Sequence, residues 1–210
     1  MPAVRSMRPM LALLTSALLL CGVARAQDTP TDQDVVHRAI HVCASCHGDE
    51  GRSKTPAIPS LAGQQRDYVI AQLKDFRSQT RAEAGTRAYM WGISALLDNP
   101  TIFGLAEYYA ALPPAPGQRG TPSLIAAGRK IYMDGIPDRA VRACASCHGD
   151  SAEGAAGFPR LAGQHATYLH AQLKLFGSKL RPHGGVMKVE TSFLKPTEMR
   201  VVAVNPESER

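Results

Sequence analysis

The chain has 210 residues, of which 44% are hydrophobic and 20% are charged, and these proportions exclude a protein that is disordered throughout. Lysine and arginine number 24 against 18 for aspartate and glutamate, which gives a formal net charge of +6. A basic excess can indicate nucleic-acid binding, but three of these basic residues lie in an N-terminal segment that we expect to be removed.

The N-terminus has the pattern of a secretory signal peptide. Arg5 and Arg8 precede an apolar run over residues 10–21, and an Ala-x-Ala cleavage site ends at Ala26. This run of 12 residues is shorter than the about 20 that a membrane anchor needs. We therefore predict that residues 1–26 are cleaved, that the mature chain is periplasmic, and that it has no membrane span, so that any membrane association is peripheral.

Helical periodicity dominates the rest of the chain. Four segments have apolar residues at helical spacing: 35–43, 69–76, 124–132 and 169–176. A further helix is expected after Asp98, a good N-cap, with Pro100 in its first turn. Near the C-terminus Lys195 replaces this N-cap and Pro206 interrupts the pattern, so the final helix is expected to be short. No segment alternates as a strand would, and the predicted fold class is all-α.

The chain also repeats itself. Two motifs recur: Cys-Ala-Ser-Cys-His-Gly-Asp at 43–49 and 144–150, and Leu-Ala-Gly-Gln at 61–64 and 161–164. Between the copies, residues 112–122 contain four prolines and two glycines, which cannot continue a helix and should form an extended, stiff connector. We therefore expect a duplication, with one domain over residues 27–116 and a second over residues 117–210.

Each repeat contains C-x-x-C-H, the signature of covalent c-type haem attachment. The two thiols would bond the vinyl groups of the porphyrin, and the histidine that follows would lie under the iron. A zinc ribbon needs cysteine pairs about 15–20 residues apart, and a thioredoxin-type dithiol needs a βαβ context. Neither condition is met, so the sequence predicts two haem c groups. The residues predicted to hold them are Cys43, Cys46 and His47 in the first copy, and Cys144, Cys147 and His148 in the second.

Met90 and Met187 are candidates for the sixth ligand of each iron. They lie 43 residues after His47 and 39 residues after His148, each ahead of a final helix. A thioether is a soft ligand that suits low-spin haem iron, whereas a methionine can equally fill core space. The same position in both repeats favours ligation, and His183 is the rival to Met187.

Pro59 and Pro159 follow the two histidines by 12 and 11 residues. A backbone carbonyl at each could accept the other ring N–H of the ligand histidine. The alternative is that each proline only shapes its loop.

Together these motifs resemble the dihaem cytochrome c4 family. The resemblance rests on C-x-x-C-H-G, Pro-x-Leu-Ala-Gly-Gln, Tyr-x-x-x-Gln-Leu-x-x-Phe and a late Met in each unit, from about residue 34 to residue 203. It implies two class I cytochrome c domains related by a pseudo-twofold axis, with haems close across their interface. It also implies His47/Met90 and His148/Met187 ligation, with the carbonyls of Pro59 and Pro159 bonded to the histidines.

The resemblance further implies a periplasmic carrier of single electrons between respiratory partners, with a donor such as a cytochrome bc complex and an acceptor such as a haem-copper oxidase. Residues 27–116 contain 8 basic and 10 acidic residues, whereas residues 117–210 contain 13 and 8. Haem propionates would add about four negative charges, so the whole molecule is near neutral and no nucleic-acid partner is expected. The basic half could orient docking toward an acidic partner.

Two other functions remain open at this stage. A small dihaem peroxidase or sulfur-compound oxidase would need a labile sixth ligand, with His183 or Glu190 recruited beside Met187. A cytochrome subunit of a dehydrogenase complex would have the same motifs as a free carrier. Trp91 follows Met90 but has no counterpart at Lys188, so the two haem environments are expected to differ.

Overall fold

The structure is a computed structural model that describes residues 31–82 and 87–209. The predicted signal peptide, residues 1–26, lies outside the described residues. The described residues form α-helices with short 3₁₀ turns and two isolated β-bridges, which confirms the predicted all-α class. Among the helices of the described ranges, none combines the length and the apolar character needed to cross a bilayer.

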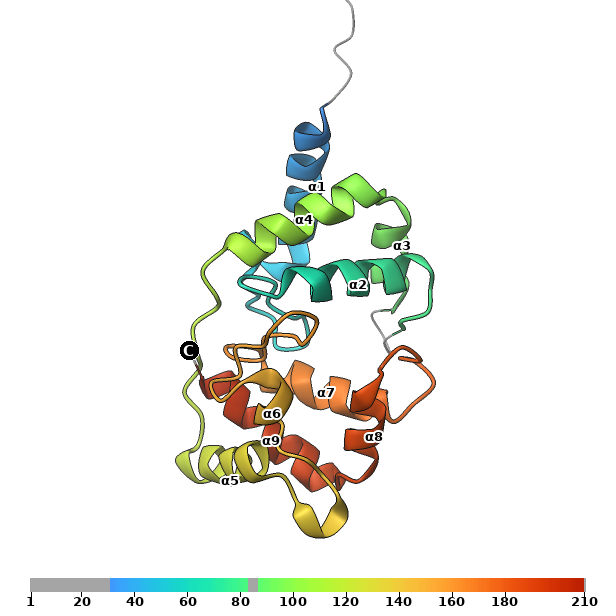
Figure 1. Ribbon diagram of the computed structural model, residues 1–210. Helices are drawn as coiled ribbons and strands as arrows, with labels where there is room; N and C mark the ends of the chain where they lie inside the picture. Colours follow the sequence, from blue (N-terminus) through green and yellow to red (C-terminus); the bar gives the residue numbers. More distant parts are fainter. Residues whose placement is uncertain (1–30, 83–86, 210) are drawn as a thin grey trace, which may run out of the picture.

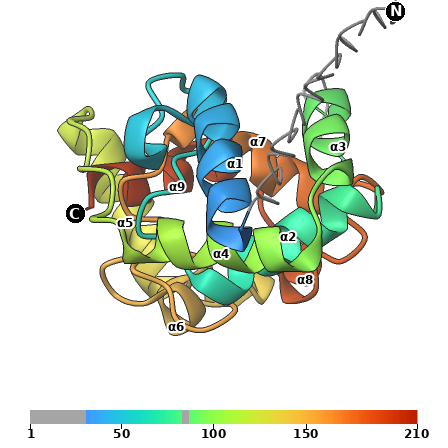
Figure 2. The same cartoon turned by 90° about the horizontal axis from the view of Figure 1, so that it is seen from above.

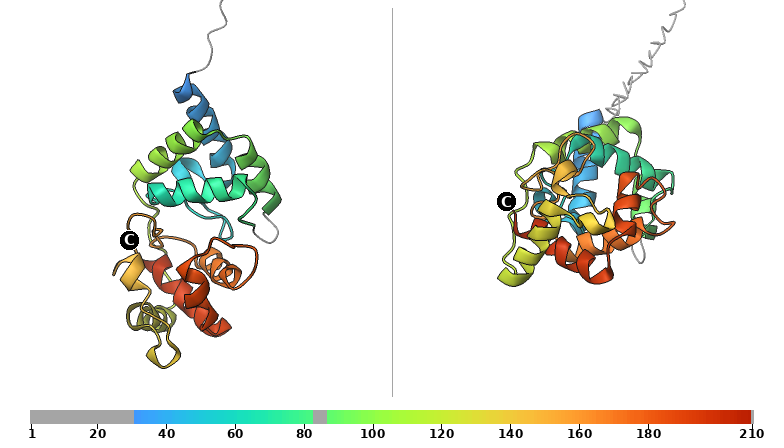
Figure 3. Two further views of the ribbon diagram at one scale, coloured as in Figure 1. Left: turned by 45° about the vertical axis from the view of Figure 1, so that its right-hand side comes forward. Right: turned by 60° about the horizontal axis from the view of Figure 1, so that its bottom comes forward.

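Two groups of helices stack one above the other (Figures 1 and 3). The first half contains α1 (Asp32–His47), η1 (Asp49–Gly51), α2 (Arg66–Arg77), α3 (Arg87–Ala95) and α4 (Asn99–Ala111). The second half contains α5 (Pro122–Asp134), η2 (Pro137–Arg139), α6 (Ala145–His148), α7 (Ala166–Phe176), α8 (Val186–Ser192) and α9 (Pro196–Ser208). In the first half α4 packs on α1 and α2, and in the second half α9 packs on α5 and α7.

Helix α4 begins as the sequence predicts. The Asp98 side chain accepts a hydrogen bond from the Thr101 N–H at 2.9 Å, and a proline occupies the first turn. The inner face of α4 is fully buried, as Ile102, Leu105, Ala106 and Tyr109 show.

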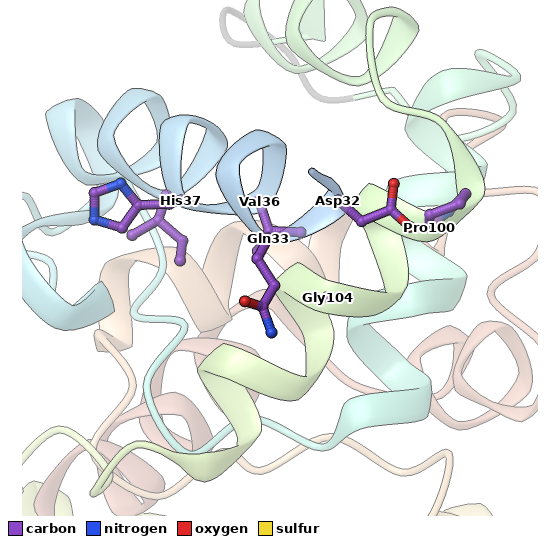
Figure 4. A pocket seen from close by; sticks show the side chains of 7 residues that line it. Asp32, Gln33, Val36, His37, Pro100 and Gly104 are labelled. Carbon is purple, nitrogen blue, oxygen red and sulfur yellow. The ribbon is translucent and has the colours of Figure 1, made fainter. Parts of the chain in front are cut away.

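Helices α1 and α4 cross at a glycine (Figure 2). A Cβ atom at Gly104 would lie 2.5 Å from a methyl carbon of Val36, so only glycine lets the two helices approach this closely. Figure 4 shows the residues that line a surface depression beside this crossing: Asp32 of α1 lies beside Pro100 of α4, Gln33 lies near Gly104, and His37 lies further along α1. The crossing fixes the direction of α1, and α1 ends on the first C-x-x-C-H motif.

The two halves present their motifs differently. In the first half α1 continues through Cys43 and Cys46 to His47. In the second half α5 ends at Asp134, and the short helix α6 carries the motif. Between α5 and α6 the chain forms η2 and an antiparallel bridge between Ile136 and Val141. The second half therefore contains a loop ahead of its motif that the first half lacks.

The predicted short C-terminal helix is wrong. Helix α9 has 13 residues, as many as α4, and Pro206 lies inside its last turn. A proline near the end of a helix removes only one backbone hydrogen bond. Burial of Val202, Ala203 and Pro206 outweighs that loss. At the other end Glu198 accepts a hydrogen bond from the Lys195 N–H at 2.8 Å and so replaces the missing N-cap side chain.

The connector lies across both Leu-Ala-Gly-Gln loops. Residues 113–121 have no regular secondary structure, as the prolines predict. A Cβ at Gly63 would lie 2.7 Å from the Pro114 ring, and one at Gly163 would lie 2.1 Å from the Ala115 carbonyl oxygen. Both glycines also have a positive φ, +66° and +74°. The repeated glycine is therefore required by the path of the connector.

Gly163→Ala is expected to lower the free energy of unfolding by about 1–3 kcal/mol, because alanine disfavours this φ and its methyl group would meet the connector. Thermal unfolding of the holoprotein measures the effect. Gly157→Ala is the matched control, because a Cβ there meets nothing within 4 Å. Equal unfolding midpoints for the two variants would show that the connector does not constrain Gly163.

The two halves meet through reciprocal contacts, as expected for units related by a twofold axis. The interface includes residues 59–65 and α2 of the first half, and residues 159–165 and α7 of the second. Gln64 of the first half bonds Arg160 of the second, and Gln164 of the second half bonds Ser60 of the first.

Candidate haem sites

The first histidine is buried at the C-terminal end of α1. Gly48 follows it with φ +79°, a conformation that ends the helix and turns the chain away. His47 Nδ1 lies 2.8 Å from the Pro59 carbonyl oxygen. Because a carbonyl can only accept, the ring proton is on Nδ1 and the lone pair is on Nε2. The imidazole is therefore oriented with its metal-binding nitrogen away from the proline loop.

The second histidine repeats this arrangement. His148 Nδ1 donates to the Pro159 carbonyl oxygen at 3.0 Å, and Gly149 follows with φ +82°. Burial lowers the pKa of His148, opposed by the hydrogen bond to Pro159, so the ring is neutral at neutral pH. A neutral imidazole with one fixed N–H is the state in which histidine binds a metal. The structure thus contains the hydrogen bonds for which Pro59 and Pro159 were proposed.

Cys43, Cys46, Cys144 and Cys147 form no disulfide with one another. Burial raises the pKa of Cys43, and it raises the pKa of Cys144 to about 11. Both thiols are therefore protonated at neutral pH. In the described ranges no cluster of three or more His, Cys, Asp and Glu side chains could hold a metal ion.

These donors fit a covalently bound haem. In each copy two cysteine side chains lie one helical turn apart, and the histidine that follows has its lone pair on Nε2 because its Nδ1 donates to a proline carbonyl. A thiol that adds to a vinyl group needs no neighbouring metal ligands, so the absence of a zinc cluster from the described residues is compatible with this chemistry.

Met90 and Met187 lie in equivalent short helices that the sequence analysis did not predict. Met90 belongs to α3, which packs on α2, and Met187 belongs to α8, which packs on α7. Both side chains are half-buried. In chain order, Met90 therefore lies in the helix between α2 and α4, and Met187 lies in the helix between α7 and α9.

His183 and Glu190, the groups considered for an enzymatic site beside Met187, have other partners. His183 Nδ1 lies 2.9 Å from Asp75 Oδ1 of the first half. Glu190 accepts hydrogen bonds from the backbone N–H and the guanidinium of Arg142. His183 is thus paired with the first half, and Glu190 is paired with the segment that leads to the second motif.

Two buried arginines lie at the interface and were not predicted from the sequence. Arg81 and Arg181 are 4% and 6% exposed, and their guanidinium groups stack on Phe76 and Phe176. Each arginine donates to the glutamine of its own half and to that of the other half. Arg181 bonds Gln172 Oε1 at 2.7 Å and Gln72 Oε1 at 2.9 Å. Arg81 bonds Gln72 Oε1 at 2.8 Å and Gln172 Oε1 at 3.2 Å. Their signal in the sequence is that each arginine lies five residues after the phenylalanine of the repeated Tyr-x-x-x-Gln-Leu-x-x-Phe motif.

Comparisons with known proteins decide the family. The family model for cytochrome c matches residues 125–208. A cytochrome c-552 from Acidithiobacillus ferridurans is 38% identical and covers 80% of this chain and 75% of its own. A cytochrome c4 from Thiocapsa roseopersicina is 36% identical and covers 79% of this chain and 86% of its own. The chain belongs to the cytochrome c4 family.

The cytochrome c4 fold is confirmed by a solved structure. The crystal structure of reduced recombinant cytochrome c4 from Pseudomonas stutzeri matches with a TM-score of 0.77 and 27% identity, over 87% of this chain and all of that one. The protein is therefore a dihaem electron carrier of the cytochrome c4 type, and two haem c groups are its cofactors. Another relative, from Thiomonas intermedia, is named a thiosulfate dehydrogenase electron acceptor and is 32% identical over 77% of this chain and 75% of its own.

Proposed function

We propose that this cytochrome c4 carries single electrons in the periplasm and performs no bond chemistry of its own. The observation that supports this most directly is the repeated imidazole geometry, with Nδ1 of His47 and of His148 bonded to a proline carbonyl. Such a bond fixes the ring and raises its basicity, as a permanent axial ligand requires.

In this proposal each half holds its haem with the same set of residues. Cys43 and Cys46 tether the first group, and Cys144 and Cys147 tether the second. The axial ligands are His47 with Met90, and His148 with Met187. Bound haem iron supplies reversible one-electron chemistry. The chain's own contribution is to fix both imidazoles, to provide a soft sixth ligand and to keep water away from the iron.

An optical redox titration of the purified holoprotein tests this assignment. Two low-spin haems of high potential are expected, with the weak red-edge band of methionine sulfur bound to ferric iron. A high-spin or low-potential haem would show that Met90 or Met187 is not a stable ligand. Assays with peroxide and with reduced sulfur compounds then test the enzymatic alternative, for which we expect no turnover.

We place the domain boundary near Pro116, with a signal peptide over residues 1–26 and domains over 27–116 and 117–210. Location in the periplasm follows from the predicted cleavage after Ala26. N-terminal sequencing of the native protein is expected to begin at Gln27. A mature chain that retains residues 1–26 would contradict export by cleavage at this site.

The electron partners that we propose are a donor such as a cytochrome bc complex and an acceptor such as a haem-copper oxidase. The second half carries 13 basic and 8 acidic residues, so an acidic docking surface would favour it. The relative from Thiomonas intermedia favours a second candidate, in which a thiosulfate dehydrogenase is the donor. Mixing the oxidised cytochrome with such a dehydrogenase and thiosulfate distinguishes the two, because only the second candidate predicts rapid reduction.

Electron transfer to an acidic partner is expected to slow by roughly tenfold between low and physiological ionic strength, because salt screens the attraction. Lys179→Glu in the second half should slow the bimolecular reaction at low salt, measured by stopped-flow spectroscopy. Lys54→Glu is the matched control, since Lys54 is also exposed but lies in the first half. Equal slowing by both variants would exclude docking through the second half.

A further inference from the structure

The peptide group that bonds the first histidine is hydrogen-bonded at both of its ends. Its carbonyl, from Pro59, accepts from His47 Nδ1 at 2.8 Å. Its N–H, from Ser60, donates to Gln164 Oε1 at 2.9 Å. Gln164 belongs to the other half of the molecule, so a side chain of the second half bonds the same peptide group as the histidine of the first.

The second histidine has the same arrangement in reverse. The Pro159 carbonyl accepts from His148 Nδ1 at 3.0 Å, and the N–H of the same peptide group, from Arg160, donates to Gln64 Oε1 at 2.8 Å. The two bridges are therefore reciprocal. Each runs from an interface glutamine through one peptide group to a histidine of the opposite half.

Both glutamines are held rigidly in this position. Gln64 and Gln164 are 8% and 5% exposed. Each side-chain amide also donates to the residue from which it accepts. Gln64 Nε2 donates to the Arg160 carbonyl at 3.0 Å, and Gln164 Nε2 donates to the Ser60 carbonyl at 2.9 Å. Each Oε1 also accepts from the next backbone N–H of its own loop, that of Gln65 or His165. These bonds fix the orientation of both side-chain amides, with Oε1 as the acceptor and Nε2 as the donor.

A peptide group bonded at both ends is polarised. A bond accepted from its N–H shifts electron density toward its carbonyl oxygen, and cooperativity of this kind strengthens the second bond by roughly 10–30%. A stronger acceptor for the imidazole N–H makes that ring a better donor to a metal and stabilises ferric iron. The glutamine therefore acts on the iron without touching its ligands.

We propose that Gln64 and Gln164 are positioning residues through which each half sets the reduction potential of the haem in the other half. Gln164 acts on the haem at His47, and Gln64 acts on the haem at His148. The inference rests on the proposed axial ligation.

Gln164→Leu tests the proposal, because leucine has a similar volume and removes the acceptor. We expect the equilibrium constant for reducing the first haem to rise by about threefold, which is about 28 mV at 59 mV per tenfold. The second haem should change much less. Gln64→Leu should give the mirror result. Both potentials are measured by NMR-monitored redox titration, from the ring-current-shifted methyl signals of Met90 and Met187 in the reduced protein.

Gln164→Glu separates this role from a merely structural one and replaces the leucine variant should that variant fail to fold. A carboxylate is a stronger acceptor for the Ser60 N–H, so the first haem should become harder to reduce, opposite to the leucine variant. Loosening of the interface would shift the potential in the same direction for both substitutions.

The outcomes are distinguishable. Shifts confined to the haem of the substituted half, equal shifts of both haems, or no shifts would overturn the inference. If the methyl signals of Met90 and Met187 lack haem ring-current shifts in the unaltered protein, the proposed ligation itself is overturned, and with it the basis of this inference.

Discussion

Met90→Ala is expected to lower the reduction potential of the first haem by roughly 0.2 V, a part of the about 0.8 V range that axial ligands set. In the proposed ligation the Met90 thioether stabilises ferrous iron, and its loss would open a coordination site. The ferric spectrum should lose part of its red-edge band and gain high-spin features. Potentiometric titration with optical detection measures both changes on one sample, and the haem at His148 should keep its potential.

Met133 provides the matched control for this experiment. It is a half-buried methionine that packs against the core of the second half, directly before the loop that leads to the motif. Met133→Ala should lower stability by about 1–3 kcal/mol and leave both potentials in place. A Met90→Ala protein with an unaltered potential and spectrum would exclude Met90 as the sixth ligand. Met187→Ala applies the same test to the other haem.

Blocking haem attachment in the second half is expected to prevent its stable folding. This half spans 94 residues, and a small domain buries a smaller fraction of its surface on folding than a large one does. Three of the seven residues in the buried core clusters of this half are alanines, beside Tyr132, Tyr168, Leu169 and Val202. A tethered porphyrin adds a large apolar surface and a covalent staple, so the double variant Cys144→Ala/Cys147→Ala should lose most of the α-helix signal contributed by this half.

Circular dichroism and limited proteolysis measure this loss, and fragments of the first half should survive digestion. Ser146→Ala is the control, because it lies between the two cysteines but keeps both thiols. It removes the bonds from the Ser146 hydroxyl to the Ala143 carbonyl and to Cys147 Sγ. Cooperative unfolding of the cysteine variant at the midpoint of the unaltered protein would show that the polypeptide folds without its cofactor.

The sequence predicted the elements whose cause is local. Asp98 caps α4 because its side chain meets an N–H three residues ahead, and that contact is visible in the sequence as an N-cap followed by a proline. The C-x-x-C-H motif and its repetition identified the haem sites for the same reason, since the spacing itself expresses the chemistry. The glycine that precedes each interface glutamine was also recognised, but only as part of a repeated motif.

What the sequence could not predict depends on contacts between distant segments. Helix α9 extends through Pro206 because α5 and α7 bury its face, which no local pattern reveals. Short helices α3 and α8 contain too few turns to show periodicity. Gln64 and Gln164 were visible as part of the repeat, but their partners were not. The glutamines bond the backbone of Ser60 and Arg160, so the side chains at these two positions differ and give no repeated pattern.

The reciprocal bonds at the interface have the geometry of an isologous contact, in which surface patch A of one unit meets patch B of the other, and B meets A. In a dimer of identical chains a single substitution at such a glutamine would change both bridges together, and the two units would stay alike. Fusion of the units into one chain breaks that constraint, because codons 64 and 164 can mutate independently. The duplicated chain can therefore evolve two unequal halves while keeping the contact that symmetric units would share.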